Sequence, residues 1–211
     1  IQYKTYGSGK PELAELLGGA AARATTTADK AETLRELGDV QREQLDEIAL
    51  AIASYEHSLT TDPRTEGSRS GLRALIKKSE HRAEVVRVLL AAYVAADDWK
   101  LILDITEHRL SATEETPAQI AVLMEAARVS EDRADDAEAA FTLVRRALLL
   151  DPSQDTTVSE IFRLAEKTRA WRPLADALRE CIDGRDDLAW ARALRFRMGA
   201  VLETHLDEAR A

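Results

Sequence analysis

The four histidines are the side chains best suited to acid-base or metal chemistry at neutral pH: His57, His81, His108 and His205. A helical zinc site needs two histidines four residues apart on one face, and no two of these four have that spacing. Three of them directly follow a glutamate in the sequence. We therefore interpret the histidines as surface residues and predict no catalytic residue.

The other candidate sites for chemistry are incomplete as well. Cys181 is the single cysteine, which excludes an intrachain disulfide or a thiolate zinc cluster, and its helical surroundings predict a small buried residue. Segment 7–10 (GSGK) lacks the upstream glycine and the preceding strand of a phosphate-binding loop. An acidic run lacks the alternation and central glycine of a calcium loop: Glu131, Asp132, Asp135 and Asp136. We expect no metal, no cofactor and no enzymatic activity.

A cluster of basic residues stands out on this acidic chain. It consists of Arg64, Arg69, Arg73, Lys77, Lys78, His81 and Arg82. Two interpretations are open: the cluster meets an acidic partner, or it is a solvated loop and helix face.

Composition and charge narrow the class of protein. The chain has 211 residues, 45% hydrophobic and only 5% aromatic, with five prolines and nine glycines, which favours helices over the frequent turns of an all-β protein. A formal net charge of -9 argues against a nucleic-acid or anionic-membrane surface, since both need a positive field. The longest apolar run, Val88 to Ala96, is about half the roughly 20 residues that span a bilayer. We expect no membrane insertion and a cytoplasmic location, although a trimmed N-terminus would look the same.

Apolar residues recur at three- and four-residue spacing along nearly the whole chain, which predicts an all-α fold. We expect eleven helices and the start of another, with these approximate spans: Pro11 to Arg23, Lys30 to Leu45, Glu47 to Thr60, Ser68 to Lys78, His81 to Ala95, Trp99 to Ser111, Pro117 to Glu131, Asp135 to Leu149, Asp155 to Lys167, Trp171 to Ile182 and Leu188 to Glu203. Asp29, Thr116 and Asp186 are candidate N-caps. The polar run Arg64 to Gly71 is predicted to be a mobile loop or hinge.

An internal repeat links three parts of the chain. LGDVQREQLDEI, from Leu37, aligns without gaps with MGAVLETHLDEA, from Met198, at an offset of 161. AARVSEDRADDA, from Ala126, lies 89 residues after the first copy and 72 before the last. The first two copies stay in register through a second helix, up to the pairs Asp62-Pro63 and Asp151-Pro152. Trp99 and Trp171 open similar segments 72 residues apart.

At these residues the chain resembles the tetratricopeptide-repeat (TPR) family, whose pattern has a Leu-Gly pair in the first helix and small, aromatic, small and proline positions in and after the second. The first copy fills that pattern with Leu37-Gly38, Ala51, Tyr55, Ser58 and Pro63. The second keeps Ala140, Ala147 and Pro152 but has Ala126-Ala127 and Val144, and the third keeps Met198-Gly199. The resemblance implies a right-handed α-solenoid of antiparallel helix pairs over residues 1–211.

The packing expected in such a solenoid assigns the repeated small and aromatic residues to the core: Gly38, Ala51, Tyr55, Trp99 and Trp171. The 72-residue interval holds four predicted helices and the 89-residue interval holds five, so one helix is odd. We assign the odd helix to Ser68 to Lys78 and predict a kink or hinge within residues 64–82.

Both ends resemble cut repeats. The segment from Leu206 begins a second helix that should run further, Tyr3 aligns inside a preceding helix, and neither end has a polar capping helix. We expect a piece of a longer chain. Exposed solenoid ends also allow self-association into an oligomer.

The resemblance implies a concave groove, lined by the first helices, that binds a partner protein or peptide. The family's inner positions correspond to these residues: Arg35, Asp39, Arg42, Met124, Arg128, Glu131, Phe196, Arg197 and Ala200. The expected function is a protein-binding scaffold. Two alternatives stay open, a regulatory or substrate-recognition segment of a larger enzyme and a self-associating assembly subunit.

Overall fold

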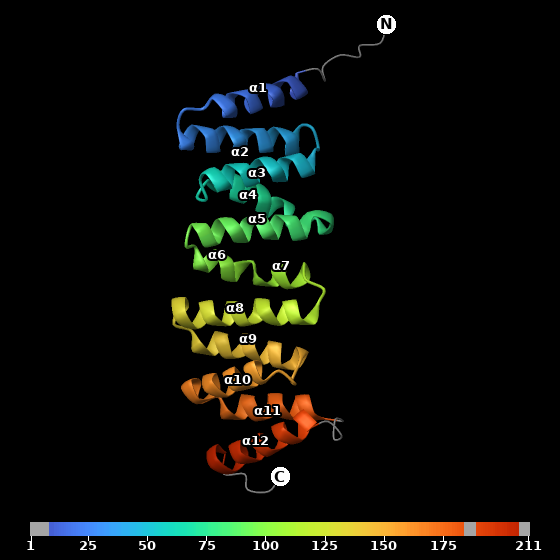
Figure 1. Cartoon of the computed structure of the whole chain (residues 1–211), viewed down its shortest axis with the longest axis vertical. Helices are drawn as coiled ribbons and strands as arrows, with labels where there is room; N and C mark the ends of the chain where they lie inside the picture. Colours follow the sequence, from blue (N-terminus) through green and yellow to red (C-terminus); the bar gives the residue numbers. More distant parts are fainter. Residues whose placement is uncertain (1–8, 184–188, 207–211) are drawn as a thin grey trace. The chain divides into compact units, whose positions relative to one another are not determined.

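The computed structural model describes residues 9–183 and 189–206, and the regular structure in these ranges is entirely helical (Figure 1). The contact pattern divides the chain into two compact units, residues 1–112 (unit 1) and 113–211 (unit 2). Tyr3, Gly7, Ser8, Asp186 and residues 207–211, to which some of the expectations above refer, lie outside the described ranges.

Unit 1 contains seven α-helices and a short 3-10 turn in its described part. They are α1 (Lys10–Arg23), α2 (Thr27–Glu43), α3 (Ile48–Thr61), α4 (Glu66–Leu75), η1 (Ser79–His81), α5 (Arg82–Ala95), α6 (Trp99–Asp104) and α7 (Thr106–Ser111). Helix α2 packs against α1 and α3, and the short α4 contacts α2, α3 and α5. This packing is consistent with stacked helix pairs, and the solenoid itself stays a prediction.

Unit 2 contains five described helices: α8 (Thr116–Ala134), α9 (Ala137–Leu150), α10 (Asp155–Thr168), α11 (Trp171–Ile182) and α12 (Ala189–His205). Helix α9 packs against α8, α10 and α11, and α12 packs on α11. Cys181 is buried in the core of this unit, which confirms the sequence expectation. No helix within the described residues combines the length and apolar content needed to cross a lipid bilayer.

The helix spans differ from the prediction most clearly in two places. The expected helix Trp99 to Ser111 is two helices, because Ile105 leaves helical geometry with φ -91° and ψ 4°. The predicted loop over Arg64 to Gly71 is helical from residue 66 onward, since α4 begins at Glu66 and buries Ser68 and Gly71, whereas a hinge there stays a prediction. The sequence had predicted this helix at Ser68 to Lys78, and small and polar residues on its buried face hid its first turn from a search for apolar periodicity.

Two of the predicted N-caps are also wrong. Thr26 caps α2, its hydroxyl accepting a 3.0 Å hydrogen bond from the Asp29 backbone N–H, so Asp29 lies within the first turn. Thr116 is the first residue of α8 and Glu115 holds the N-cap position. Thr26, three residues before Asp29, and Glu115, one residue before Thr116, have the extended backbone that is typical of an N-cap residue.

The two units share one helix pattern at a spacing of 89 residues. Four helices of unit 1 begin 89 residues before their counterparts in unit 2: α2 and α8, α3 and α9, α4 and α10, α5 and α11. The six buried residues of α5 each lie 89 residues before a buried residue of α11. The register therefore continues past Pro63, where the sequence comparison stopped. Because α10 is its counterpart, α4 is not an inserted helix, and the kink at residues 64–82 stays a prediction.

Tyr55 is the centre of the packing in unit 1. Its side chain is fully buried between two glycines, Gly38 of α2 and Gly71 of α4. A Cβ at Gly38 would lie 2.6 Å from the ring, and one at Gly71 would lie 2.5 Å from it. The core positions predicted for Gly38, Ala51 and Tyr55 are confirmed. At the spacing of 89 residues, unit 2 has Val144 in place of Tyr55 and Ala127 in place of Gly38.

Candidate partner-binding faces

Helix α2 brings the three predicted groove residues of unit 1 together. Arg35, Asp39 and Arg42 follow a spacing of four and three residues, which places them on one side of the helix. Arg35 forms an ion pair with Asp39, and the Arg42 guanidinium lies 3.6 Å from the same carboxylate. The Tyr55 hydroxyl donates a 2.6 Å hydrogen bond to Asp39. Burial, with this hydrogen bond, raises the pKa of Tyr55, so the hydroxyl stays a donor.

Helix α4 extends the same face. The aliphatic part of Arg35 lies against Gly67, where a side chain would collide with it. Arg73 forms an ion pair with Glu66 and donates a 3.3 Å hydrogen bond to the Tyr93 hydroxyl. The charges on this face thus largely satisfy one another within unit 1, and this lowers the energy that a partner can gain from them.

Two arginines of the predicted basic cluster, Arg69 and Arg82, make contacts within unit 1. Arg69 is only 5% exposed, with its guanidinium 2.7 Å from the Asp98 carboxylate and 5.2 Å from the centre of the Tyr93 ring. Arg82 donates a hydrogen bond of 3.3 Å to the Ile76 carbonyl. The remaining lysines of the cluster, Lys77 and Lys78, are exposed. The two lysines are accessible to a partner, whereas the buried Arg69 links α4 to Asp98 within unit 1.

In unit 2, Glu131 joins α8 to α10. Its carboxylate accepts hydrogen bonds of 2.9 Å from Arg163 and 2.8 Å from Lys167. These bonds lower the pKa of Glu131 to about 2. The Glu131 side chain is only 12% exposed, so its first role is to hold the two helices together on one face.

Helix α12 adds an aromatic hollow to unit 2. The Arg197 guanidinium lies 5.7 Å from the centre of the Phe162 ring of α10. The rings of Trp171 and His205 are stacked, with centroids 3.7 Å apart and planes within 5°. Together with three other residues of α12, Ala200, Val201 and Thr204, these side chains line a hollow of about 380 Å³. We call it the aromatic hollow.

The other predicted groove residues of unit 2 lie in different surroundings. Met124 is partly buried and packs against the core, so little of it is available to a partner. Arg128 is exposed on α8. Phe196 is 82% exposed and does not line the aromatic hollow. Sequence reasoning had placed Arg197 and Ala200 on the binding surface but missed Phe162, Trp171 and His205.

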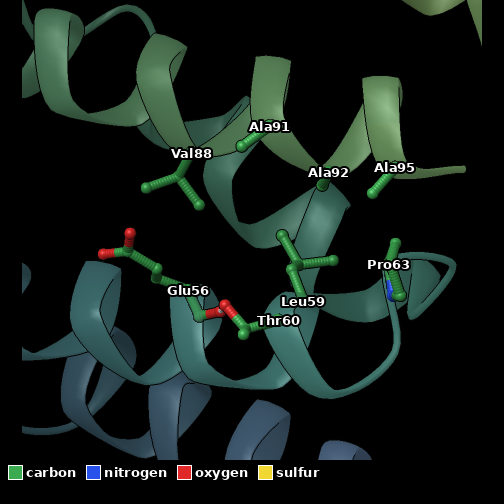
Figure 2. A pocket seen from close by; sticks show the side chains of 8 residues that line it. All are labelled: Glu56, Leu59, Thr60, Pro63, Val88, Ala91, Ala92 and Ala95. Carbon is green, nitrogen blue, oxygen red and sulfur yellow. Dashed lines mark hydrogen bonds between the residues drawn. The ribbon is translucent and has the colours of Figure 1, made fainter.

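A second hollow, of about 250 Å³, lies between α3 and α5 in unit 1 (Figure 2). Leu59 points into it from α3, small side chains of α5 form the opposite wall, and Glu56 and Arg87 are paired at 2.7 Å beside it. At the spacing of 89 residues, unit 2 has the larger Leu149 and Glu180 in place of Thr60 and Ala91. Two positions that line the hollow thus carry smaller side chains in unit 1 than in unit 2. Its lining, Glu56, Leu59, Thr60, Pro63, Val88, Ala91, Ala92 and Ala95, offers no pair of groups for acid-base chemistry.

Within the described ranges, no group of three histidine, cysteine, aspartate or glutamate side chains is placed to hold a metal ion. The arrangement of charged and aromatic side chains across alternate helices of unit 2 suits recognition of another polypeptide. Comparisons of the chain with protein-family models, with curated proteins and with solved structures found no match.

Proposed function

We propose that this chain is a protein-binding segment of the TPR type, and that its binding surface in unit 2 is the face formed by α8, α10 and α12. This face, called the α8–α10–α12 face, comprises Arg128, Glu131, Phe162, Arg163, Lys167 and Arg197. The observation that supports it most is the pair of bridges that join the three helices through side chains. Glu131 of α8 bonds Arg163 of α10, and Phe162 of α10 lies against Arg197 of α12.

The chemistry of the α8–α10–α12 face favours a polypeptide ligand. It presents guanidinium groups and an aromatic hollow side by side, and arginine and aromatic side chains are the types most enriched at binding hot spots. The bridges fix the helices before any partner arrives, which reduces the entropy lost on binding. Sequence motifs of the TPR family, in which alternate helices line the groove, support the same assignment.

A comparison of two exposed arginines of unit 2 tests this proposal. The full chain, immobilised, captures partners from a lysate of the source cells, and the captured proteins are quantified by mass spectrometry. Arg128→Glu, on the α8–α10–α12 face, should reduce specific partners about tenfold or more, as expected when a charge at an interface is reversed. Arg179→Glu makes the same charge change on α11, where Arg179 forms an exposed ion pair with Asp176.

Circular dichroism checks that both variants keep the helical content of the wild type. Partners retained by Arg179→Glu and lost by Arg128→Glu would support the α8–α10–α12 face. Equal capture by all three proteins would exclude it.

Self-association is a second candidate, favoured by exposed apolar side chains. Leu16 of α1 is 66% exposed and Phe196 of α12 is 82% exposed. Association of two chains through these side chains would remove their apolar surface from water. Light scattering over a range of concentrations, with Leu16→Glu and Phe196→Glu as variants, tests it. A wild type that stays monomeric throughout removes this candidate.

A further inference from the structure

The aromatic hollow lies in a locally basic part of an acidic chain. Helix α12 carries three arginines and one glutamate, whereas the whole chain has a net charge of -9. Arg197 stands at the edge of the hollow, over the Phe162 ring. The field beside the hollow therefore favours an anionic group.

Arg197 differs in its contacts from three other arginines of the candidate faces, Arg35, Arg42 and Arg163. Arg35 and Arg42 of unit 1 each pair with carboxylates, and Arg163 of unit 2 pairs with both Glu131 and Glu160. Across residues 9–183 and 189–206, no carboxylate lies within ion-pair distance of Arg197. Its contact in that part of the chain is the aromatic ring, which orients the guanidinium and leaves its N–H groups free to donate.

The hollow itself is built for an apolar side chain. The stacked rings of Trp171 and His205 form a flat wall, and Phe162 and Val201 add apolar surface. Its volume of about 380 Å³ is enough for one large aliphatic or aromatic side chain. Such a buried anchor, surrounded by polar groups, is the usual centre of a peptide-binding site.

The corresponding positions of unit 1 show that the hollow is not a by-product of the repeat. At the spacing of 89 residues, Phe162 and Trp171 correspond to Arg73 and Arg82. Unit 1 thus has two cations where unit 2 has two aromatic rings, and Arg73 and Arg82 are engaged in internal hydrogen bonds. The two aromatic rings that line the hollow thus have no aromatic counterpart at these positions of unit 1.

We propose that the aromatic hollow binds a leucine-sized or aromatic side chain of a partner peptide, and that a carboxylate close to it in that peptide pairs with Arg197. The proposal rests on the proposed function and names the chemistry of the partner, an acidic amphipathic segment. The bidentate donor geometry of arginine suits a carboxylate, and the apolar anchor supplies the buried contact area.

Selection from a phage-displayed library of random 12-residue peptides tests the proposal. Selected against the full wild-type chain, the library should enrich peptides that combine Trp, Phe or Leu with Asp or Glu within four residues. An enriched peptide is then synthesised with a fluorescent label, and its affinity is measured by anisotropy. Arg197→Glu should weaken binding about tenfold or more, because a charge-assisted hydrogen bond is replaced by repulsion.

Two further variants separate the two parts of the site. Arg197→Lys keeps the charge without the planar fork and should weaken binding less than Arg197→Glu does. Ala200→Trp fills the hollow from the exposed side of α12 and should abolish binding of the apolar anchor. Arg179→Glu is the control for charge and should change the affinity less than about twofold.

The outcomes distinguish this proposal from the proposed function. Peptides that lose affinity for Arg128→Glu but bind Arg197→Glu and Ala200→Trp like the wild type would overturn the assignment of the hollow and leave the α8–α10–α12 face standing. Both proposals would be overturned if the enriched peptides bind Arg128→Glu, Arg197→Glu and Ala200→Trp like the wild type. They would also be overturned if no peptide is enriched above a selection without protein.

Discussion

Replacing Gly38 with alanine tests the packing around Tyr55 most sharply. In an exposed helix interior this substitution stabilises a protein by about 0.5–1 kcal/mol, because alanine loses less backbone entropy on folding. At Gly38 the new Cβ would lie 2.6 Å from the Tyr55 ring, closer than real Cβ atoms approach another atom. Steric and entropic effects therefore act in opposite directions at this position.

The steric effect should exceed the entropic one. The ring cannot retreat from Gly38, because Gly71 faces it from the other side and Tyr55 is fully buried. Its hydroxyl is also held by a 2.6 Å hydrogen bond to Asp39. Overpacking of a core by one methyl group costs about 1–3 kcal/mol. We expect Gly38→Ala to lower the free energy of unfolding by about 1–2 kcal/mol, after the gain in helix propensity is subtracted.

Urea denaturation followed by circular dichroism at 222 nm measures the effect. The matched control is Gly18→Ala, since Gly18 lies inside α1 and a Cβ there would meet no atom within 4 Å. This control should raise the free energy of unfolding by about 0.5–1 kcal/mol. In a Tyr55→Val background, which reproduces the Val144 and Ala127 pair of unit 2, Gly38→Ala should become stabilising. If Gly38→Ala stabilises the wild type as much as Gly18→Ala does, the packing account is wrong.

Three further predictions concern buried polar groups. The Thr157 hydroxyl is buried and has no hydrogen-bond partner in the described part of the chain, whereas its counterpart Ser68 donates to Ser58 at 2.8 Å. Thr157→Val removes the unpaired hydroxyl, and Ala147→Ser supplies the hydroxyl acceptor that Ser58 provides in unit 1. Each variant should therefore raise the free energy of unfolding by about 1–2 kcal/mol in urea titrations. A lower free energy of unfolding in either variant would contradict the 89-residue register. The pKa of Glu131, about 2, lies below that of an unfolded glutamate, near 4.3, so its stabilisation is present above about pH 4.3 and is lost as the pH falls toward 2. Thermal melts between pH 5 and 2 should show a steeper loss for the wild type than for Glu131→Gln, and parallel curves would refute this. Arg69→Ala should lower the free energy of unfolding by about 1–2 kcal/mol because it removes a buried guanidinium from an ion pair whose Asp98 side chain is 36% exposed, and an unchanged free energy of unfolding would mean that Arg69 is solvated.

Sequence patterns were sufficient for most helix spans and for the core positions of Gly38, Ala51 and Tyr55. Helix α4 was misplaced because its buried face carries serine and glycine, which a search for apolar periodicity ignores. The side chain that fills the space above Gly71 is Tyr55, sixteen residues earlier, so only the packing reveals that this glycine belongs to a helix interface. The repeat register was traced only as far as Pro63 for a related reason, because the matching positions beyond it are recognised by their burial and not by their residue types.

The candidate site was harder to predict than the fold. Arg69 was assigned to the surface because of its charge, yet its partner Asp98 lies 29 residues away and draws it inward. The aromatic hollow depends on His205 meeting Trp171 across two helices, a contact that no local pattern specifies. The recurrence of tryptophan at residues 99 and 171 pointed to the region of the hollow, but we interpreted both tryptophans as core residues only.

Site-specific photo-crosslinking is the most direct test of the claim that the α8–α10–α12 face binds a partner. Benzoylphenylalanine is introduced in cells at the exposed Ala121 of α8, seven residues before Arg128, at the exposed Ala193 of α12, four residues before Arg197, or at the exposed control position Thr142 of α9, so that both arginines stay in place. The account predicts that irradiation traps the same polypeptide, identified by mass spectrometry, from positions 121 and 193 and not from position 142. Trapping that is equal at all three positions, or confined to position 142, would contradict it.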